Sequence, residues 1–134
     1  MNPSLTVAGG AGPIAAIIGQ LLTEGGDGNY AIFDVNKTLG YYAQILAQPS
    51  GSHVYVEVVS DENLDESRGY DSRQKGLLAS RHWVPADEGG NLYREWVVMG
   101  ESDRIGVAEE LLYVFTEIFM ALPSQTITVD LNLE

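Results

Sequence analysis

Three strand-like segments joined by short connections limit most strongly what this chain can fold into. Residues 30–35, 41–48 and 53–60 are rich in aromatic and β-branched side chains, which favour strands. The connections at 36–40 and 49–52 are shorter than the crossover that joins parallel strands. These segments therefore predict an antiparallel meander.

Periodicity predicts which sides of the elements are buried. Val54, Val56 and Val58 alternate with more polar residues, so these valines are expected on the core side of their strand. Apolar residues recur at helical spacing in residues 13–22 and, most clearly, in residues 105–122. The second stripe is predicted to comprise Ile105, Ala108, Leu111, Leu112, Phe115, Ile118, Phe119 and Leu122, with Glu109, Glu110 and Glu117 off the stripe.

Local signals predict where the helices begin and end. Pro13 suits the first turn of the first helix, Ser102 is a good N-cap for the long helix, and Pro123 stops that helix. A short helix is expected at 72–81, closed by the segment 83–85.

The remaining strands are expected at 92–99 and 126–133, and residues 61–71 and 87–90 are expected to be a polar loop and a turn. The order α-β-β-β-α-β-α-β predicts an α+β fold, a mainly antiparallel sheet with flanking helices. Residues 1–12 are expected to form a flexible Gly-rich leader before a single domain at 13–134.

Charge and cysteine content exclude several classes of function. The chain carries 19 acidic and 7 basic residues, a net charge of −12, and no cysteine. The charge disfavours binding to nucleic acid and to anionic membranes. The absence of cysteine removes disulfides, thiolate nucleophiles and Cys-based zinc sites. The apolar stretch 13–22 is too short to span a bilayer and no basic residue precedes it, which favours a cytoplasmic location.

One motif imitates a dinucleotide-binding fingerprint. Gly10, Gly12 and Ala15 have the G-x-G-x-x-A spacing, an apolar helix follows, and the next strand carries Asp34. Against this hypothesis, the preceding strand would be very short, Pro13 removes a backbone amide, and the later strands look like hairpins. A small nucleotide-binding enzyme stays an alternative to the main prediction.

Other residue patterns give only weak signals for catalysis or metal binding. His53 and His82 lack the spacing of paired metal ligands, and the acidic run at 61–66 lacks the alternating ligands and central glycine of a calcium loop. The serines lack the G-x-S-x-G context of a nucleophile elbow. We therefore predict a non-enzymatic protein without a cofactor, a metal site or catalytic residues.

Short blocks of the sequence resemble a bacterial family. The run 41–44, Tyr-Tyr-Ala-Gln, followed by Val-Glu-Val-Val-Ser at 56–60 and Asn63-Leu64, resembles its "Y-V-Q … E-V-x-S-N-x-x-L" block. The Leu pair at 77–78, the run Trp-Val-Pro at 83–85 and the run 91–96 resemble its "L-x-x-L-G-W-x-x-P … N-x-x-x-x-W" block. The family belongs to the type III secretion chaperone-like superfamily, with YbjN-like and Tir-chaperone-like domains.

This resemblance covers residues 13–133 and carries expectations of its own. It implies a strongly twisted antiparallel sheet with flanking helices and a non-enzymatic role in binding peptides or protein partners, often as a dimer. Two features depart from the family pattern: His82 stands where the pattern has glycine, and the Gly-rich segment before Pro13 has no counterpart.

The main functional prediction is a chaperone-like or regulatory domain that binds a protein or peptide. The acidic charge favours a basic partner. The alternatives left open are the nucleotide-binding enzyme and an acidic inhibitor that covers a toxin's basic site. A homodimer through the stripe of residues 105–122 is a separate expectation. The residues expected to contact the partner, each of which could instead serve packing or a turn, are Tyr42, Gln44, Trp83, Asn91 and Trp96.

Overall fold

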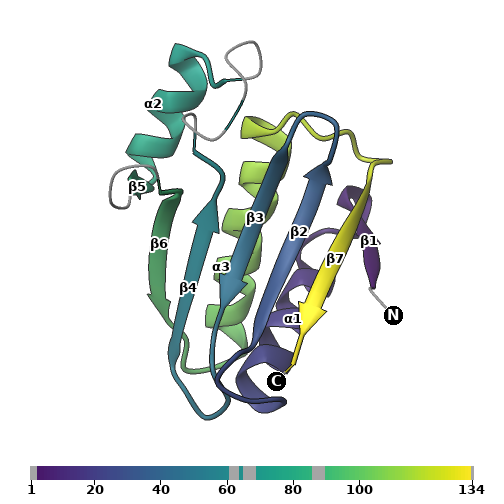
Figure 1. Cartoon of the computed structure of the whole chain (residues 1–134), viewed down its shortest axis with the longest axis vertical. Coiled ribbons are helices and arrows are strands. Elements are labelled where there is room, and N and C mark those ends of the chain that lie inside the picture. The colour runs from purple at the N-terminus through teal and green to yellow at the C-terminus, as the bar shows by residue number, and fades with distance from the viewer. Residues whose placement is uncertain (1–2, 61–63, 65–68, 86–89, 134) are drawn as a thin grey trace.

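The computed structural model shows a seven-stranded antiparallel sheet with helices on one of its faces (Figure 1). It describes residues 3–60, 64, 69–85 and 90–133. The strand order is β1-β7-β2-β3-β4-β6-β5. The strands are β1 (Ser4–Thr6), β2 (Tyr30–Asn36), β3 (Tyr41–Leu46), β4 (His53–Val58), β5 (Val84–Pro85), β6 (Leu92–Val97) and β7 (Thr126–Asn132). The helices are α1 (Ala11–Thr23), α2 (Ser72–Ser80) and α3 (Glu101–Tyr113), with a short 3₁₀ turn η1 (Val7–Gly9) and a π-helical segment η4 (Val114–Ile118).

The predicted α+β class and the antiparallel sheet are confirmed. β2, β3 and β4 pair in sequence order as the predicted meander, and β6 pairs with β4 on its other side. Val54, Val56 and Val58 are fully buried, as their alternation predicted. Figure 1 shows α1 and α3 side by side behind the sheet, while α2 lies at one end of it.

Residues 4–12 differ from the expected flexible leader. β1 pairs with β7, which places Leu5 opposite Ile127, and Val7 is buried in the core. The backbone N–H of Val7 donates to the carbonyl of Gln125 at 3.2 Å, and that of Ala8 donates to the carbonyl of Pro123 at 2.8 Å. A three-residue strand is too short for its sequence to show the alternation typical of strands. The place of β1 in the sheet therefore depends on its pairing with β7 and not on a local signal.

The predicted order of elements lacked two short strands, β1 and β5. The residues 83–85, expected only to close the short helix, instead continue into β5, which pairs with the first two residues of β6. Most of the predicted turn at 87–90 and most of the predicted loop at 61–71 lie outside the described residues.

The long C-terminal helix begins and ends at other residues than predicted. Gly100 is the N-cap, so Ser102 lies inside α3, while the carboxylate of Asp103 accepts a hydrogen bond from the backbone N–H of Met99 at 2.8 Å. The helix ends through η4, before Pro123, and Met120 then takes a positive φ of 58°.

The buried face departs in part from the predicted stripe. A π-turn holds an extra residue and shifts the phase only of the side chains that follow it, so η4 bears on Leu122 and not on Ile105 or Val107. Val107 and Val114 are buried although they were outside the stripe, whereas Ile105 and Leu122 are exposed. Glu110, predicted to lie off the stripe, is buried.

We predict that Gly25 is the least replaceable of the described glycines. Its φ is +72°, and a Cβ there would lie 2.7 Å from the carbonyl carbon of Leu133 and would also collide with the side chain of Asn29. Asn29 is buried and donates to the carbonyl of Leu21 at 2.8 Å, so this side chain cannot move away without losing its hydrogen bonds. Gly25→Ala should lower the free energy of unfolding in urea by about 1–3 kcal/mol.

The matched control is Gly76→Ala in α2, where an added Cβ meets nothing within 4 Å. Replacing a helical glycine by alanine should raise the free energy of unfolding by about 0.5–1 kcal/mol. Equal urea midpoints for the two variants would contradict the assignment of strain to Gly25.

Candidate functional site

The side of the sheet that faces away from α1 and α3, called here the open face, has no described helix packed on it (Figure 1). Its side chains are those that alternate with the buried residues of each strand, and most are half-buried by their neighbours. They are Tyr30, Ile32 and Asp34 of β2, Tyr42, Gln44 and Leu46 of β3, His53, Tyr55 and Glu57 of β4, Tyr93, Glu95 and Val97 of β6, and Thr128 and Asp130 of β7.

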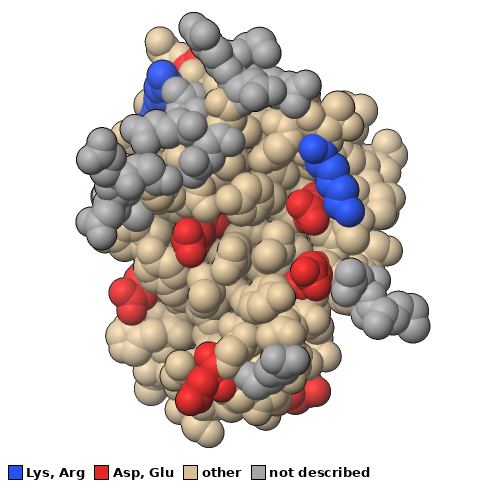
Figure 2. All heavy atoms as spheres, in the orientation of Figure 1, with Lys and Arg blue, Asp and Glu red and all other residues tan. Residues whose placement is uncertain are grey.

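Tyrosines and carboxylates dominate the open face. Tyr55 and Tyr93 stack at 5.3 Å between ring centroids, and each is flanked across the strands by a glutamate, Glu95 and Glu57 respectively. The residues that define this face include no lysine or arginine. Figure 2 shows acidic side chains spread over this side of the molecule, with lysine and arginine only in its upper part.

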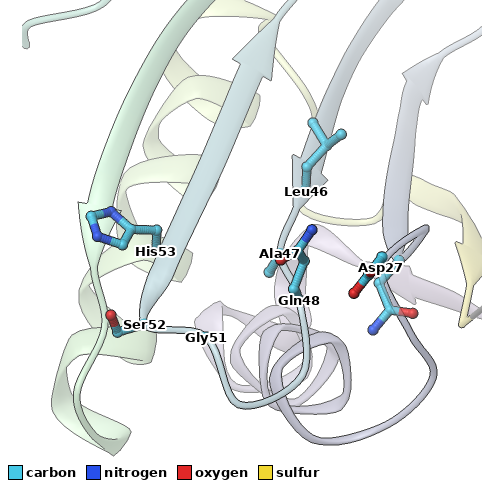
Figure 3. Close-up of a pocket in the computed structure, with 8 residues that line it drawn as sticks. Asp27, Leu46, Ala47, Gln48, Gly51, Ser52 and His53 are labelled. Carbon is cyan, nitrogen blue, oxygen red and sulfur yellow. The ribbon is translucent and has the colours of Figure 1, made fainter.

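A hollow of about 330 Å³ lies at one end of the open face (Figure 3). It is bounded by the loop before β2 and by the connection between β3 and β4. Leu46 and His53 belong to both the hollow and the open face, and Asp27 adds an exposed carboxylate on the opposite wall. The remaining lining residues are Asn29, Ala47, Gln48, Gly51 and Ser52. The hollow therefore adjoins the open face at this end of the sheet, and Asp27 is the acidic residue among those that line it.

Three of the five residues predicted to bind a partner lie at or beside the open face. Tyr42 and Gln44 point outward from β3, and Gln44 lies opposite Glu57. Asn91 precedes β6 and donates a hydrogen bond to the hydroxyl of Tyr42 at 3.0 Å. Its side-chain oxygen accepts from the backbone N–H of Ser60 at 3.2 Å. Asn91 thus positions the Tyr42 ring and ties the end of β4 to the start of β6.

The other two predicted residues lie on the opposite side of the sheet. Trp96 sits across from the buried Val54, and Trp83 is buried, with its ring centroid 5.9 Å from that of Trp96 and nearly perpendicular to it. The predicted set of five is therefore divided between two faces. Sequence alone could not separate them, because which set of an alternating strand faces the helices depends on its register with the neighbouring strands.

Around these tryptophans lies a charged group that the sequence did not predict, called here the arginine cluster: Arg81, Trp83, Arg94, Trp96 and Glu110. The Glu110 side chain is only 9% exposed. Its Oε1 accepts from Nη2 of Arg81 at 2.6 Å, and both carboxylate oxygens accept from Nε of Arg81, at 3.1 and 3.0 Å. Its Oε2 also accepts from the Trp83 indole N–H at 3.0 Å.

The two arginines of this cluster have different environments. The hydrogen bond with Glu110 raises the pKa of Arg81, whose guanidinium also lies 3.7 Å from the centre of the Tyr113 ring. Burial lowers the pKa of Arg94, and the charge of Arg81 acts in the same direction, while Glu110 opposes it. The guanidinium of Arg94 stacks over Trp96 at 4.2 Å. One carboxylate therefore joins the end of α2, the middle of α3 and strand β6.

The residues of the dinucleotide-like motif do not meet in the structure. Gly10 and Gly12 lie at the start of α1, on the helix-covered side, whereas Asp34 is on the open face between Tyr42 and Thr128. All pairings of the described strands are antiparallel, so β1, α1 and β2 do not form the adjacent parallel pair of a dinucleotide-binding unit.

Comparisons with protein-family models, with curated proteins and with solved structures found no match. Among the described residues, no group of three or more His, Cys, Asp or Glu is arranged to hold a metal ion. None of the helices in that part of the chain is long and apolar enough to cross a membrane.

We predict that Glu110 is an important stabilising residue of the helix-covered side. Glu110→Gln keeps the size of the side chain but leaves two guanidinium groups without their shared counter-charge. The free energy of unfolding in urea should fall by about 2–3 kcal/mol, because a buried charge partner is lost.

Glu109→Gln is the matched control, since Glu109 precedes it on the same helix and is exposed. That change should stay within about 0.5 kcal/mol of the unmodified protein. If both variants unfold at the same urea concentration, the ion pair contributes nothing to stability.

Proposed function

We propose that this protein is a non-enzymatic binding domain that holds a basic segment of a partner protein on its open face. The observation that carries the proposal is the composition of that face, where tyrosines on β2, β3, β4 and β6 alternate with carboxylates and no lysine or arginine is among its defining residues. None of the described helices packs on this face.

Arginine and lysine side chains suit such a surface chemically. A cation can lie over a tyrosine ring while its N–H groups donate to a neighbouring carboxylate, and both contacts favour positive charge. The pairs Tyr55–Glu95 and Tyr93–Glu57 each offer a ring and a carboxylate side by side across two strands. The aliphatic stems of the same cations can pack on Ile32 and Leu46, which are half-buried on this face.

Long-range charge supports the same assignment. The net charge of −12 attracts basic partners and speeds their encounter at low salt, and salt screens this attraction. Because most carboxylates of the open face are partly solvated, the electrostatic contribution should be spread over several residues and not concentrated in one.

A chaperone-like role in the cytoplasm agrees with this proposal. A face that recognises charge and aromatic contact would hold unfolded or extended basic segments of different sequence. The homodimer expected from the resemblance to the secretion-chaperone-like superfamily stays a prediction.

The proposal is tested by charge reversal on the open face. Glu57→Lys should weaken binding of a fluorescein-labelled peptide of arginine and phenylalanine by about fivefold at low salt, as measured by fluorescence anisotropy, because it replaces an attraction by a repulsion. Glu109→Lys makes the same change of net charge on the outer side of α3 and should change the affinity less than twofold.

Equal weakening by the two variants would show that only net charge matters and would remove the open face as the site. No measurable binding of the peptide to the unmodified protein would also overturn the proposal. Binding of lysozyme, a folded basic protein, without binding of the peptide would favour the acidic-inhibitor alternative instead.

A further inference from the structure

Arg94 has no carboxylate of its own in the part of the chain that the structure describes. Its Nη1 lies 3.7 Å from Oε2 of Glu110, which is beyond hydrogen-bonding distance. Both oxygens of Glu110 already accept hydrogen bonds, from Arg81 and from the indole of Trp83. The cluster thus holds two guanidinium groups against one carboxylate, a local positive charge in a strongly acidic protein.

The guanidinium of Arg94 is held in place although it is not hydrogen-bonded to a described residue. It stacks over Trp96 at 4.2 Å and lies 5.9 Å from the ring centre of Trp83. The side chain is 23% exposed, so part of the planar donor group reaches solvent. A guanidinium with a fixed plane and free N–H donors is suited to bidentate contact with a carboxylate.

The backbone next to Arg94 is also available. β5 pairs with β6 only at Leu92 and Tyr93, so from Arg94 to Val97 no described strand covers the outer edge of β6. An unpaired strand edge accepts an extended segment by backbone hydrogen bonds. Alternate side chains of such a segment would lie on the same side of the sheet as Arg94 and Trp96.

We propose that the outer edge of β6 binds an extended segment of a partner protein, and that Arg94 takes up an Asp or Glu side chain of that segment. Trp96 supplies the ring against which the neighbouring apolar part of the segment packs. This site lies on the side of the sheet opposite to the open face and has the opposite charge preference. It is therefore independent of the basic-partner proposal, and either can fail without the other.

The tryptophans provide a direct readout. The chain has two tryptophans, and both are in the arginine cluster, so intrinsic tryptophan emission reports on this site alone. The probe is an acetylated and amidated peptide of alternating glutamate and threonine, which has β propensity, no terminal charge and no aromatic ring. The control peptide has glutamine in place of glutamate.

The glutamate peptide should change the tryptophan emission of the unmodified protein in a saturable way. The glutamine peptide should bind at least about tenfold more weakly, because it cannot form charge-assisted hydrogen bonds with Arg94. Arg94→Gln should remove this preference, and Arg94→Lys should restore only part of it, since an ammonium group lacks the planar fork. Arg104→Gln removes a half-buried arginine of α3 elsewhere on the helix-covered side and should keep the preference.

Circular dichroism and urea unfolding of each variant separate loss of binding from loss of fold. If Arg94→Gln is folded and still prefers the glutamate peptide, Arg94 is not the binding residue. Equal affinity of the unmodified protein for the two peptides, or an emission spectrum that neither peptide changes, would also overturn the proposal.

Discussion

The packing of α1 and α3 on one face of the antiparallel sheet is the constraint on which the other features of this protein depend. Every strand presents alternate residues to its two sides, so covering one side buries valine, isoleucine and phenylalanine there and leaves the alternate residues outside. The open face is therefore a direct consequence of how the core is built. Its tyrosines shield the backbone while keeping polar groups at the surface, and its carboxylates keep an uncovered sheet in solution.

Glu110 is the buried carboxylate that holds neighbouring elements together on the helix-covered side of the sheet. Trp83 and Arg81 approach from the end of α2, and Arg94 approaches from β6, so a single carboxylate of α3 connects three elements. Buried ion pairs gain less than their Coulomb attraction because the charges lose hydration. Here the indole N–H and the planar guanidinium satisfy both oxygens, and the rings of Trp83 and Trp96 pack against each other beside them.

Much of the fold follows from local sequence signals, and the candidate sites follow from them only in part. The valine alternation of β4 and the short connections were sufficient to predict the meander, because adjacent antiparallel strands need only a turn between them. Tyr42 and Gln44 were predicted contact residues and do lie on the open face, while their binding role stays a prediction. The strands β1 and β5 were missed because two or three residues carry no periodic pattern, and β7, the partner of β1, follows much later in the chain.

The sequence by itself determined the α+β class, the antiparallel meander and the acidic charge, because each depends on local periodicity, connection length or composition. Only the tertiary structure decided which side of β6 meets the helices, and therefore that Trp83 and Trp96 lie away from Tyr42. It also decided that Glu110 is buried, since the approach of Arg81 and Arg94 to this carboxylate depends on packing between distant elements. Such contacts join residues far apart in the chain, and no local pattern records them.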